Sequence, residues 1–210
     1  MLTTSAGGCA TNEFTRPGHD GHDQGPVWLA PPQLPPWPVV WFSVDDGGED
    51  GAGCHAIRRW EFAVDDGRSG PGPGTLVVDP GDRGGRSAWE RFVAQASEIM
   101  ERVPHARWVH YASREPRRLR ECVAAYGAPA GFLERLEEAL FELLPRGVLR
   151  CVRLPLRSHS LEEVAAVAGF HGQGRDLDPG AVVASGAERL LAMRAIWRWM
   201  LEQGPKDHCG

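Results

Sequence analysis

The stretch Val39–Val44, with the sequence VVWFSV, is an apolar run interrupted by a single serine. Pro38 precedes it, and Asp45, Asp46 and Gly47 follow it, so turn-forming residues bound the run on both sides. A short apolar run of this kind is typical of a strand buried on both faces, because a half-exposed strand alternates polar and apolar side chains. The sequence therefore predicts a central strand of a sheet covered on both sides.

Two further strands are expected downstream, in residues 55–64 (HAIRRWEFAV) and 74–79 (GTLVVD), with Gly- and Asp-rich turns between them. A helix follows, because Ser87 and Glu90 form an S-x-x-E capping box. Apolar residues then recur at helical spacing and place one stripe against the sheet: Trp89, Phe92, Val93, Ala96, Ile99, Met100 and Val103. Residues 106–112 (ARWVHYA) form the next predicted strand.

The second half of the chain predicts mainly helices. Pro116 suits the first turn of one helix, where its missing amide hydrogen costs nothing. A second helix is expected over residues 131–144, and Ser160 with Glu163 forms a capping box that opens a third. The last helix is expected over residues 187–203. This order predicts an α/β domain with a central mixed sheet of about five strands flanked by helices.

The composition suggests where this domain begins and ends. Residues 1–36 are rich in Gly, Pro, Asp and His, so we expect a disordered tail or linker there. We expect the domain over residues 38–203 and a flexible C-terminus over residues 204–210. The tail contains the motif HDGHD, in which metal binding would be adventitious because a flexible segment loses entropy on ordering: His19, Asp20, His22 and Asp23.

The overall composition bounds the class of protein. The 210 residues carry a net charge of −5, and 42% of them are hydrophobic, which fits a soluble globular domain. The chain shows neither a secretory leader nor an apolar run of the roughly 20 residues a membrane span needs. We therefore expect a cytoplasmic protein without a membrane partner. Reduced thiols are expected at five widely spaced cysteines without a C-x-x-C pair: Cys9, Cys54, Cys122, Cys151 and Cys209.

Positive charge is concentrated in two arginine clusters, Arg114, Arg117, Arg118 and Arg120, and Arg146, Arg150, Arg153 and Arg157. The acidic net charge argues against non-specific nucleic-acid binding, which usually leaves a basic footprint. The simplest interpretation is that both clusters are solvated faces of an arginine-rich chain. Local binding of nucleic acid is the alternative.

Four segments, read in order, carry a resemblance: VVWFSVDDG (39–47), WVHYASREPRRL (108–119), LFELLP (140–145) and RCVRLPLRSHSLEEVAAVAGF (150–170). Their order resembles the RNase H-like domain of the YprB type, which is found alone or at the C-terminus of RecB-like nucleases. The resemblance implies an RNase H-like fold over residues 38–203. It also implies nuclease chemistry with two divalent ions, Mg²⁺ or Mn²⁺, held by carboxylates.

The resemblance implies two acids at i and i+2 on the first strand, because alternate strand residues share a face. Ser43 stands at the first position and Asp45 at the second. A serine cannot replace a charged carboxylate ligand. Asp46 is a further candidate only if the strand ends before it, because adjacent strand residues point to opposite faces.

Two further motifs match with changes. His110 and Glu115 fit the family's H-Y-x-x-x-E pattern as candidate catalytic residues, although Tyr111 could equally be core and Glu115 a helix cap. Glu142 matches the third acid with one extra methylene group. Glu162 stands where the family usually has a lysine.

The last helix matches the family's final acidic motif with Ser185 and Gly186 in place of its tyrosine and asparagine. Glu188 and Arg189 then stand at its two acids, and the cation of Arg189 would oppose metal binding. The candidate metal ligands are Asp45, Asp46, Glu142 and Glu188, and the candidate catalytic residues are Asp45, Glu142, Glu188, His110 and Glu115.

Three hypotheses follow from these substitutions. The first is an RNase H-like domain with an eroded metal site, which binds nucleic acid or a protein partner with weak or absent cleavage. The second is an active Mg²⁺- or Mn²⁺-dependent exonuclease or endonuclease. The third is a non-catalytic protein-interaction module that uses the arginine clusters and surplus tryptophans. Convergence of Asp45, Glu142 and Glu188 within metal-sharing distance would favour the second.

Overall fold

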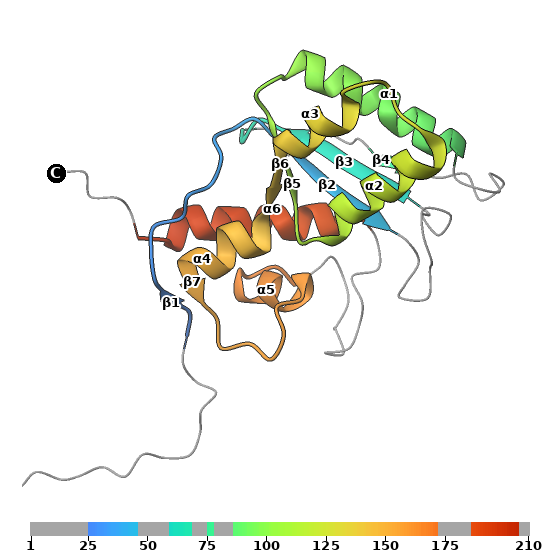
Figure 1. Cartoon of the computed structure of the whole chain (residues 1–210). Coiled ribbons are helices and arrows are strands. Elements are labelled where there is room, and N and C mark those ends of the chain that lie inside the picture. The colour runs from blue at the N-terminus through green and yellow to red at the C-terminus, as the bar shows by residue number, and fades with distance from the viewer. Residues whose placement is uncertain (1–24, 46–58, 69–74, 78–85, 172–185, 206–210) are drawn as a thin grey trace, which may run out of the picture.

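The computed structural model describes residues 25–45, 59–68, 75–77, 86–171 and 186–205. Over these residues it is a mixed α/β domain, with a five-stranded mixed sheet and helices on both of its faces (Figure 1). The predicted α/β class and mixed sheet are therefore confirmed. No helix of the described part of the chain is long and apolar enough to cross a membrane.

The sheet has the strand order β4-β3-β2-β5-β6. Its centre is β2 (Val39–Asp45), the strand predicted from the VVWFSV run. On one side, β3 (Arg59–Asp65) and then β4 (Thr75–Val77) continue the sheet in antiparallel pairs. On the other side, β5 (Arg107–His110) and β6 (Leu140–Glu142) run parallel to β2. The predicted central strand, β2, thus lies between an antiparallel half of the sheet, formed by β3 and β4, and a parallel half, formed by β5 and β6.

Helices cover the two faces of the sheet in separate layers (Figure 1). The first layer consists of α1 (Arg86–Arg102), α2 (Arg114–Tyr126) and α3 (Phe132–Ala139). The second consists of α5 (Leu161–Val167) and the long α6 (Gly186–Gln203), which packs across β2 and β3. Burial on both faces explains the continuous apolar run of β2, because neither set of alternating side chains reaches solvent.

Aromatic rings fill both sides of the sheet. On the first face, the Phe92 ring stacks on Trp60 with centroids 4.4 Å apart and on Phe42 with centroids 5.7 Å apart. On the second face, Trp41 of β2 meets Trp197 of α6 edge to face at 5.5 Å. None of the eight tryptophans is exposed: Trp41, Trp60, Trp89, Trp108 and Trp197 are buried, and Trp28, Trp37 and Trp199 are half-buried. The tryptophan side chains therefore contribute mainly to packing inside the domain.

The segment before β2 packs on the domain, which corrects the predicted boundary of the N-terminal tail. β1 (Val27–Trp28) pairs antiparallel with β7 (Val152–Arg153) in a small second sheet. Leu29 N donates to Cys151 O at 2.8 Å, and the Trp28 ring lies 5.1 Å from that of Trp199. The domain thus includes residues 25–36, which the composition had assigned to the tail. Residues 1–24 lie outside the described residues.

The helix predicted over residues 131–144 is too long. α3 ends at Ala139, and β6 follows at once, paired with β5 through Trp108 with Leu140 and Val109 with Phe141. A π-helical turn, η2 (Leu143–Val148), and the short α4 (Leu149–Cys151) lead on to β7. The apolar spacing of a helix continues through residue 144, but pairing with β5 determines the structure of residues 140–142.

The two capping boxes have different outcomes. Ser160 is the N-cap of α5, and its hydroxyl accepts a hydrogen bond from Glu163 N at 3.2 Å, as predicted. The Glu163 carboxylate in turn accepts from Ser158 N at 3.0 Å. α1, in contrast, begins at Arg86, so Ser87 lies inside its first turn. The last helix was predicted within one residue of its observed start and at its observed end.

Two of the five cysteines lie in the described part of the chain. Cys122 and Cys151 are buried and form no disulfide bond, in agreement with the reduced thiols predicted. Cys9, Cys54 and Cys209 lie outside the described residues, as does the C-terminus from residue 206 onward.

Candidate functional site

Three of the candidate site residues end the three parallel strands. Asp45 is the last residue of β2, His110 of β5 and Glu142 of β6. Because these strands are parallel, their C-terminal ends lie at the same edge of the sheet. Open α/β sheets bind ligands at the carboxyl ends of their strands, at the point where the strand order reverses. The edge is therefore the candidate site.

The pleat of the strands separates these acids between the two faces of the sheet. Trp41 of β2 and Phe141 of β6 both belong to the core under α6. Asp45 lies four residues after Trp41 and shares its face, whereas Glu142 directly follows Phe141 and extends to the opposite face. His110 pairs with Glu142 in the β5–β6 register and shares its face. Asp45 and Glu142 therefore extend from opposite faces of the sheet at its C-terminal edge.

Glu188, the remaining described metal candidate, is a half-buried residue in the first turn of α6. Asp46 lies outside the described residues, as do the HDGHD residues His19, Asp20, His22 and Asp23. Within the part of the chain that the structure describes, no three His, Cys, Asp or Glu side chains form a group that could hold a metal ion.

The position of the first family acid is in contact with the last helix. Ser43 is buried in β2, and its Oγ accepts a hydrogen bond from Arg189 Nε at 3.0 Å. The two residues are 146 positions apart in the sequence. The motif alignment predicted both as site positions, and the structure brings them together. The two groups in contact are a hydroxyl group and a guanidinium group, where the resemblance implies two carboxylates.

A buried carboxylate that sequence reasoning missed lies beside Ser43. Glu61 of β3 is the direct cross-strand partner of Ser43, so the two side chains lie on the same face of the sheet. The Glu61 side chain is 0% exposed, and its Oε1 accepts from Arg59 Nη1 at 3.3 Å. Its Oε2 is buried without a hydrogen-bond partner. A sequence signal existed, because Arg59, Glu61 and Ala63 alternate with apolar residues in RWEFAV.

Burial and the surrounding charges together shift the pKa of Glu61. Burial raises the pKa of Glu61 above its ordinary value, because a desolvated carboxylate is costly to ionise. Arg59 and, more weakly, Arg189 oppose that increase, while the nearby negative charge of Asp45 adds to it. Asp45, Glu61, Arg59 and Arg189 therefore form one cluster of interacting charges where β2 ends and β3 begins.

The residues of the H-Y-x-x-x-E motif are buried on two sides of the sheet, with His110 and Glu115 beside α2 and Tyr111 beside α5. His110 Nδ1 lies 2.6 Å from Ala112 O and 3.7 Å from Glu115 Oε2, and both side chains are buried. The Tyr111 hydroxyl lies 2.7 Å from His159 O and 3.0 Å from Ser160 O, which joins the end of β5 to the start of α5. Burial raises the pKa of Tyr111, and the negative charges of Glu162 and Glu163 add to that effect. These contacts favour the interpretation that Tyr111 is a core residue.

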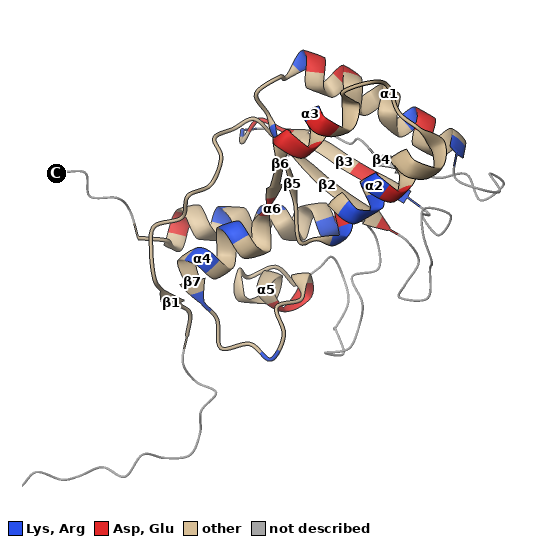
Figure 2. Ribbon diagram, viewed as in Figure 1, with Lys and Arg blue, Asp and Glu red and all other residues tan. Residues whose placement is uncertain are grey.

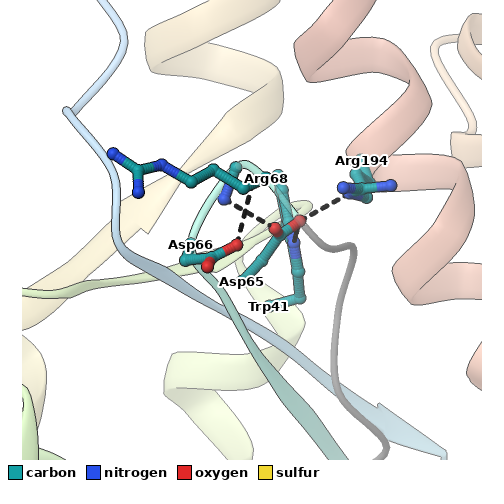
Figure 3. Close-up of polar contacts among 6 residues, drawn as sticks. Trp41, Asp65, Asp66, Arg68 and Arg194 are labelled. Carbon is teal, nitrogen blue, oxygen red and sulfur yellow. Dashed lines mark hydrogen bonds and ion pairs between the residues drawn. The ribbon is translucent and has the colours of Figure 1, made fainter.

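A second arginine of α6 binds the opposite end of β3 (Figure 3). The Asp65 side chain is completely buried, and its Oδ2 accepts from Arg194 Nε at 2.5 Å and from Trp41 Nε1 at 3.0 Å. Its Oδ1 accepts from Gly67 N at 2.9 Å. Asp65 thus joins β2, β3 and α6, so it contributes to the docking of the helix that carries Arg189.

The two arginine clusters differ in their surroundings. In the α2 cluster, Arg117 and Arg118 pair with Glu121, and Arg120 pairs with Glu137. The second cluster is exposed and has no ion pair within the described residues: Arg146, Arg150, Arg153 and Arg157. No Asp or Glu occurs between residues 143 and 161. Figure 2 shows these basic positions along α4, β7 and the loop after β7, on one side of the molecule. We call this second cluster the arginine strip.

Comparisons of the chain with models of protein families, with curated proteins and with solved structures gave no match.

Proposed function

We propose that this chain is an RNase H-like domain of the YprB type, as found in RecB-like nucleases, whose two-metal site is eroded. In this proposal the domain binds nucleic acid and cleaves it weakly or not at all. The motifs in the sequence are the starting point. The order of elements, the contact between Ser43 and Arg189, and the arginine strip support it.

The order of elements agrees with the one that the resemblance implies. Three antiparallel strands come first, followed by α1, β5, α2, α3 and β6, with α6 at the end of the domain. The strand that carries the D-x-E-like pair, β2, lies at the centre of the sheet. Its second acid, Asp45, lies at the C-terminal edge, where α/β sheets bind ligands.

The single observation that carries the proposal is the hydrogen bond from Arg189 to Ser43. In a two-metal nuclease, carboxylates at neighbouring site positions hold the ions that activate water and stabilise the leaving oxygen. Here the two aligned positions touch, which supports the motif register. Their side chains bring one positive charge and no negative charge. The contact therefore fits a site in which these two positions are still neighbours but no longer carry metal ligands.

The arginine strip supports the binding part of the proposal. Exposed arginines that form no ion pair among the described residues are available to bind phosphate oxygens through charged hydrogen bonds. The phosphate backbone supplies most of the affinity of non-specific nucleic-acid binding, and an acidic net charge elsewhere on the protein does not remove a local basic strip. The alternative of a protein-interaction module loses one of its two arguments, because no tryptophan is exposed.

The test measures cleavage and binding on the same protein. We expect no cleavage of single- or double-stranded DNA or RNA above background with Mg²⁺ or Mn²⁺. We expect a labelled oligonucleotide to bind at low salt, and the double variant Arg150→Ala/Arg153→Ala to weaken it. Loss of two phosphate contacts should lower the slope of log K against log salt by about 1.4 for a single strand. The matched control, Arg86→Ala/Arg102→Ala, removes exposed arginines that already have glutamate partners.

Each alternative predicts a different result. Robust cleavage by the wild-type protein that Asp45→Ala abolishes would replace the proposal by that of an active metal-dependent nuclease. Binding that is absent at low salt, or that the strip variant and the control weaken equally, would refute the nucleic-acid function and favour a protein-interaction module.

A further inference from the structure

We infer that the groove between α5 and the loop after β7 holds a base of a single-stranded nucleic acid whose phosphates bind to the arginine strip. The inference rests on the proposed function for the choice of nucleic acid as the ligand. It deepens that function because it assigns a separate position to the base, and because only an unpaired base can occupy that position.

The groove is a surface hollow of about 500 Å³ at the end of the arginine strip. This volume falls within the range of small-molecule sites, roughly 300–1,000 Å³, so one base fits into it. Apolar atoms form most of its surface, which suits the faces of a base. The loop after β7 and α5 supply its walls: Pro155, Leu156, Arg157, Glu163, Ala166 and Val167.

The walls of the groove are anchored to the domain. Leu156 and Val167 are half-buried and pack against the core on the α6 face of the sheet. The loop is joined to α5 by the Glu163 carboxylate, whose Oε2 accepts from Ser158 N at 3.0 Å and from Ser158 Oγ at 2.7 Å. The two walls are therefore held together before a ligand binds, which lowers the cost of ordering the site.

Positive charge and apolar surface are interleaved in the loop after β7. Arg153 and Arg157 are exposed members of the arginine strip, and the residues between them include Pro155 and Leu156 of the groove. Arg157 belongs to both the strip and the groove. Proteins that bind single strands combine a basic surface along the phosphates with faces on which bases stack, and an arginine guanidinium plane is one such face. A strand that binds the strip therefore has its bases beside the groove.

The acidic side chain in the lining favours a base over a phosphate at this position. Glu163, together with Glu162 in the same turn of α5, repels a phosphate group. A carboxylate can, however, accept a hydrogen bond from an exocyclic amino group of a base. The phosphates are thus directed to the arginines and the base to the groove. In a duplex the bases are stacked and paired, so none of them enters the groove without the cost of unpairing.

The experiment measures binding of a fluorescein-labelled DNA oligonucleotide of mixed sequence, as a single strand and as a duplex, to each full-length variant at low salt with EDTA. Ala166→Leu fills the groove without a change of charge, and leucine is also a good helix former. We expect it to weaken single-strand binding by about fivefold or more, the contribution of one stacked base, and duplex binding by less than about twofold. The matched control, Ala94→Leu, makes the same change at an exposed alanine of α1 and should alter neither. Melting curves check that each variant is folded, and Ala166→Gln replaces Ala166→Leu if the latter does not fold.

Two results would overturn the inference while nucleic-acid binding itself remains. In the first, the folded Ala166 variant binds the single strand at least as tightly as Ala94→Leu does. In the second, it weakens single-strand and duplex binding equally. The proposed function fails on different results, since it is refuted by Asp45-dependent cleavage, which leaves the groove intact as a base site, or by a wild-type protein that binds no oligonucleotide, which refutes both.

Discussion

The substitution Asp65→Asn should destabilise the fold strongly, because it removes the negative charge that holds Arg194 of α6 against β3. The Asp65 carboxylate is completely buried and accepts three hydrogen bonds, from Arg194, Trp41 and Gly67 (Figure 3). An asparagine has one acceptor oxygen and one amino group in the same space. At least one of the three donors must then face another donor.

The expected magnitude follows from these contacts. Removing one partner of a buried ion pair costs about 3–5 kcal/mol, because the other charge is left uncompensated. The Arg194 side chain is 14% exposed, so solvent can compensate for little of the loss, and its Nη2 is already buried without a partner. We therefore expect about 3–5 kcal/mol of destabilisation, which corresponds to a melting temperature lower by roughly 6–20 °C for a chain of this size.

Urea unfolding followed by tryptophan fluorescence and circular dichroism measures this loss, because Trp197 of α6 contacts Trp41 of the sheet beneath it. The matched control is Asp66→Asn, which alters an exposed carboxylate that accepts from Arg68 N and should cost about 1 kcal/mol or less. In a double-mutant cycle, Arg194→Met should recover part of the loss, because the unpaired charge is removed as well. Equal stabilities of Asp65→Asn and Asp66→Asn would refute the view that this ion pair docks α6.

Two further predictions concern the N-terminal segment and Glu61. Deleting residues 1–24 should leave the melting temperature within a few degrees, whereas deleting residues 1–36 should cost roughly 2–3 kcal/mol, because β1 and the half-buried Trp28 and Leu34 are lost. Equal melting temperatures of the two deletions would contradict the docking of residues 25–36. In metal-free buffer, stability from Glu61 should fall as pH rises above its ordinary pKa of 4.5, because burial raises the folded-state pKa and the folded protein binds the proton more tightly. Urea unfolding should therefore find that Glu61→Gln gains stability relative to wild type with rising pH, and a pH-independent difference would argue against a buried, desolvated carboxylate.

Local signals predicted the elements that local interactions determine. The apolar run of β2 was sufficient, because only a strand covered on both faces has no polar side. The Ser160–Glu163 capping box was sufficient for α5, because the hydrogen bond that caps the helix joins residues three positions apart. The prediction failed at residues 140–142, where the helical spacing of apolar residues continues but pairing with β5 makes a strand. That pairing joins segments about thirty residues apart, which a window of sequence does not contain.

The N-terminal boundary was missed for a related reason. The proline-rich composition of residues 30–38 is typical of a linker, yet Val27 and Trp28 just before it contact β7 and Trp199, more than a hundred residues later. A proline-rich segment can pack without regular hydrogen bonding when apolar side chains such as Leu34 reach the core. Composition reports how many apolar residues a segment has, but it does not report what they contact.

The candidate site was predicted in part, because its members come from segments that are distant in the sequence. The motifs identified Ser43 and Arg189 as positions of one site, and the two are in contact. They did not identify Glu61, since its importance depends on the β2–β3 register, which aligns it with Ser43. They also grouped Asp45 with Glu142, although the pleat directs these side chains to opposite faces. A motif gives the spacing along the chain, whereas the face of each side chain depends on where each strand begins.

The two arginines of α6 suggest how the domain can remain folded without ions. In the two-metal site that the proposed function implies, carboxylates repel one another unless cations are bound. Here Arg189 and Arg194 contribute the positive charge themselves, one at Ser43 and the other at Asp65. Both contacts are to polar groups on the face of β2 and β3 that α6 covers. Both arginines therefore bring positive charge to buried polar groups of the sheet and so help to hold the last helix in place.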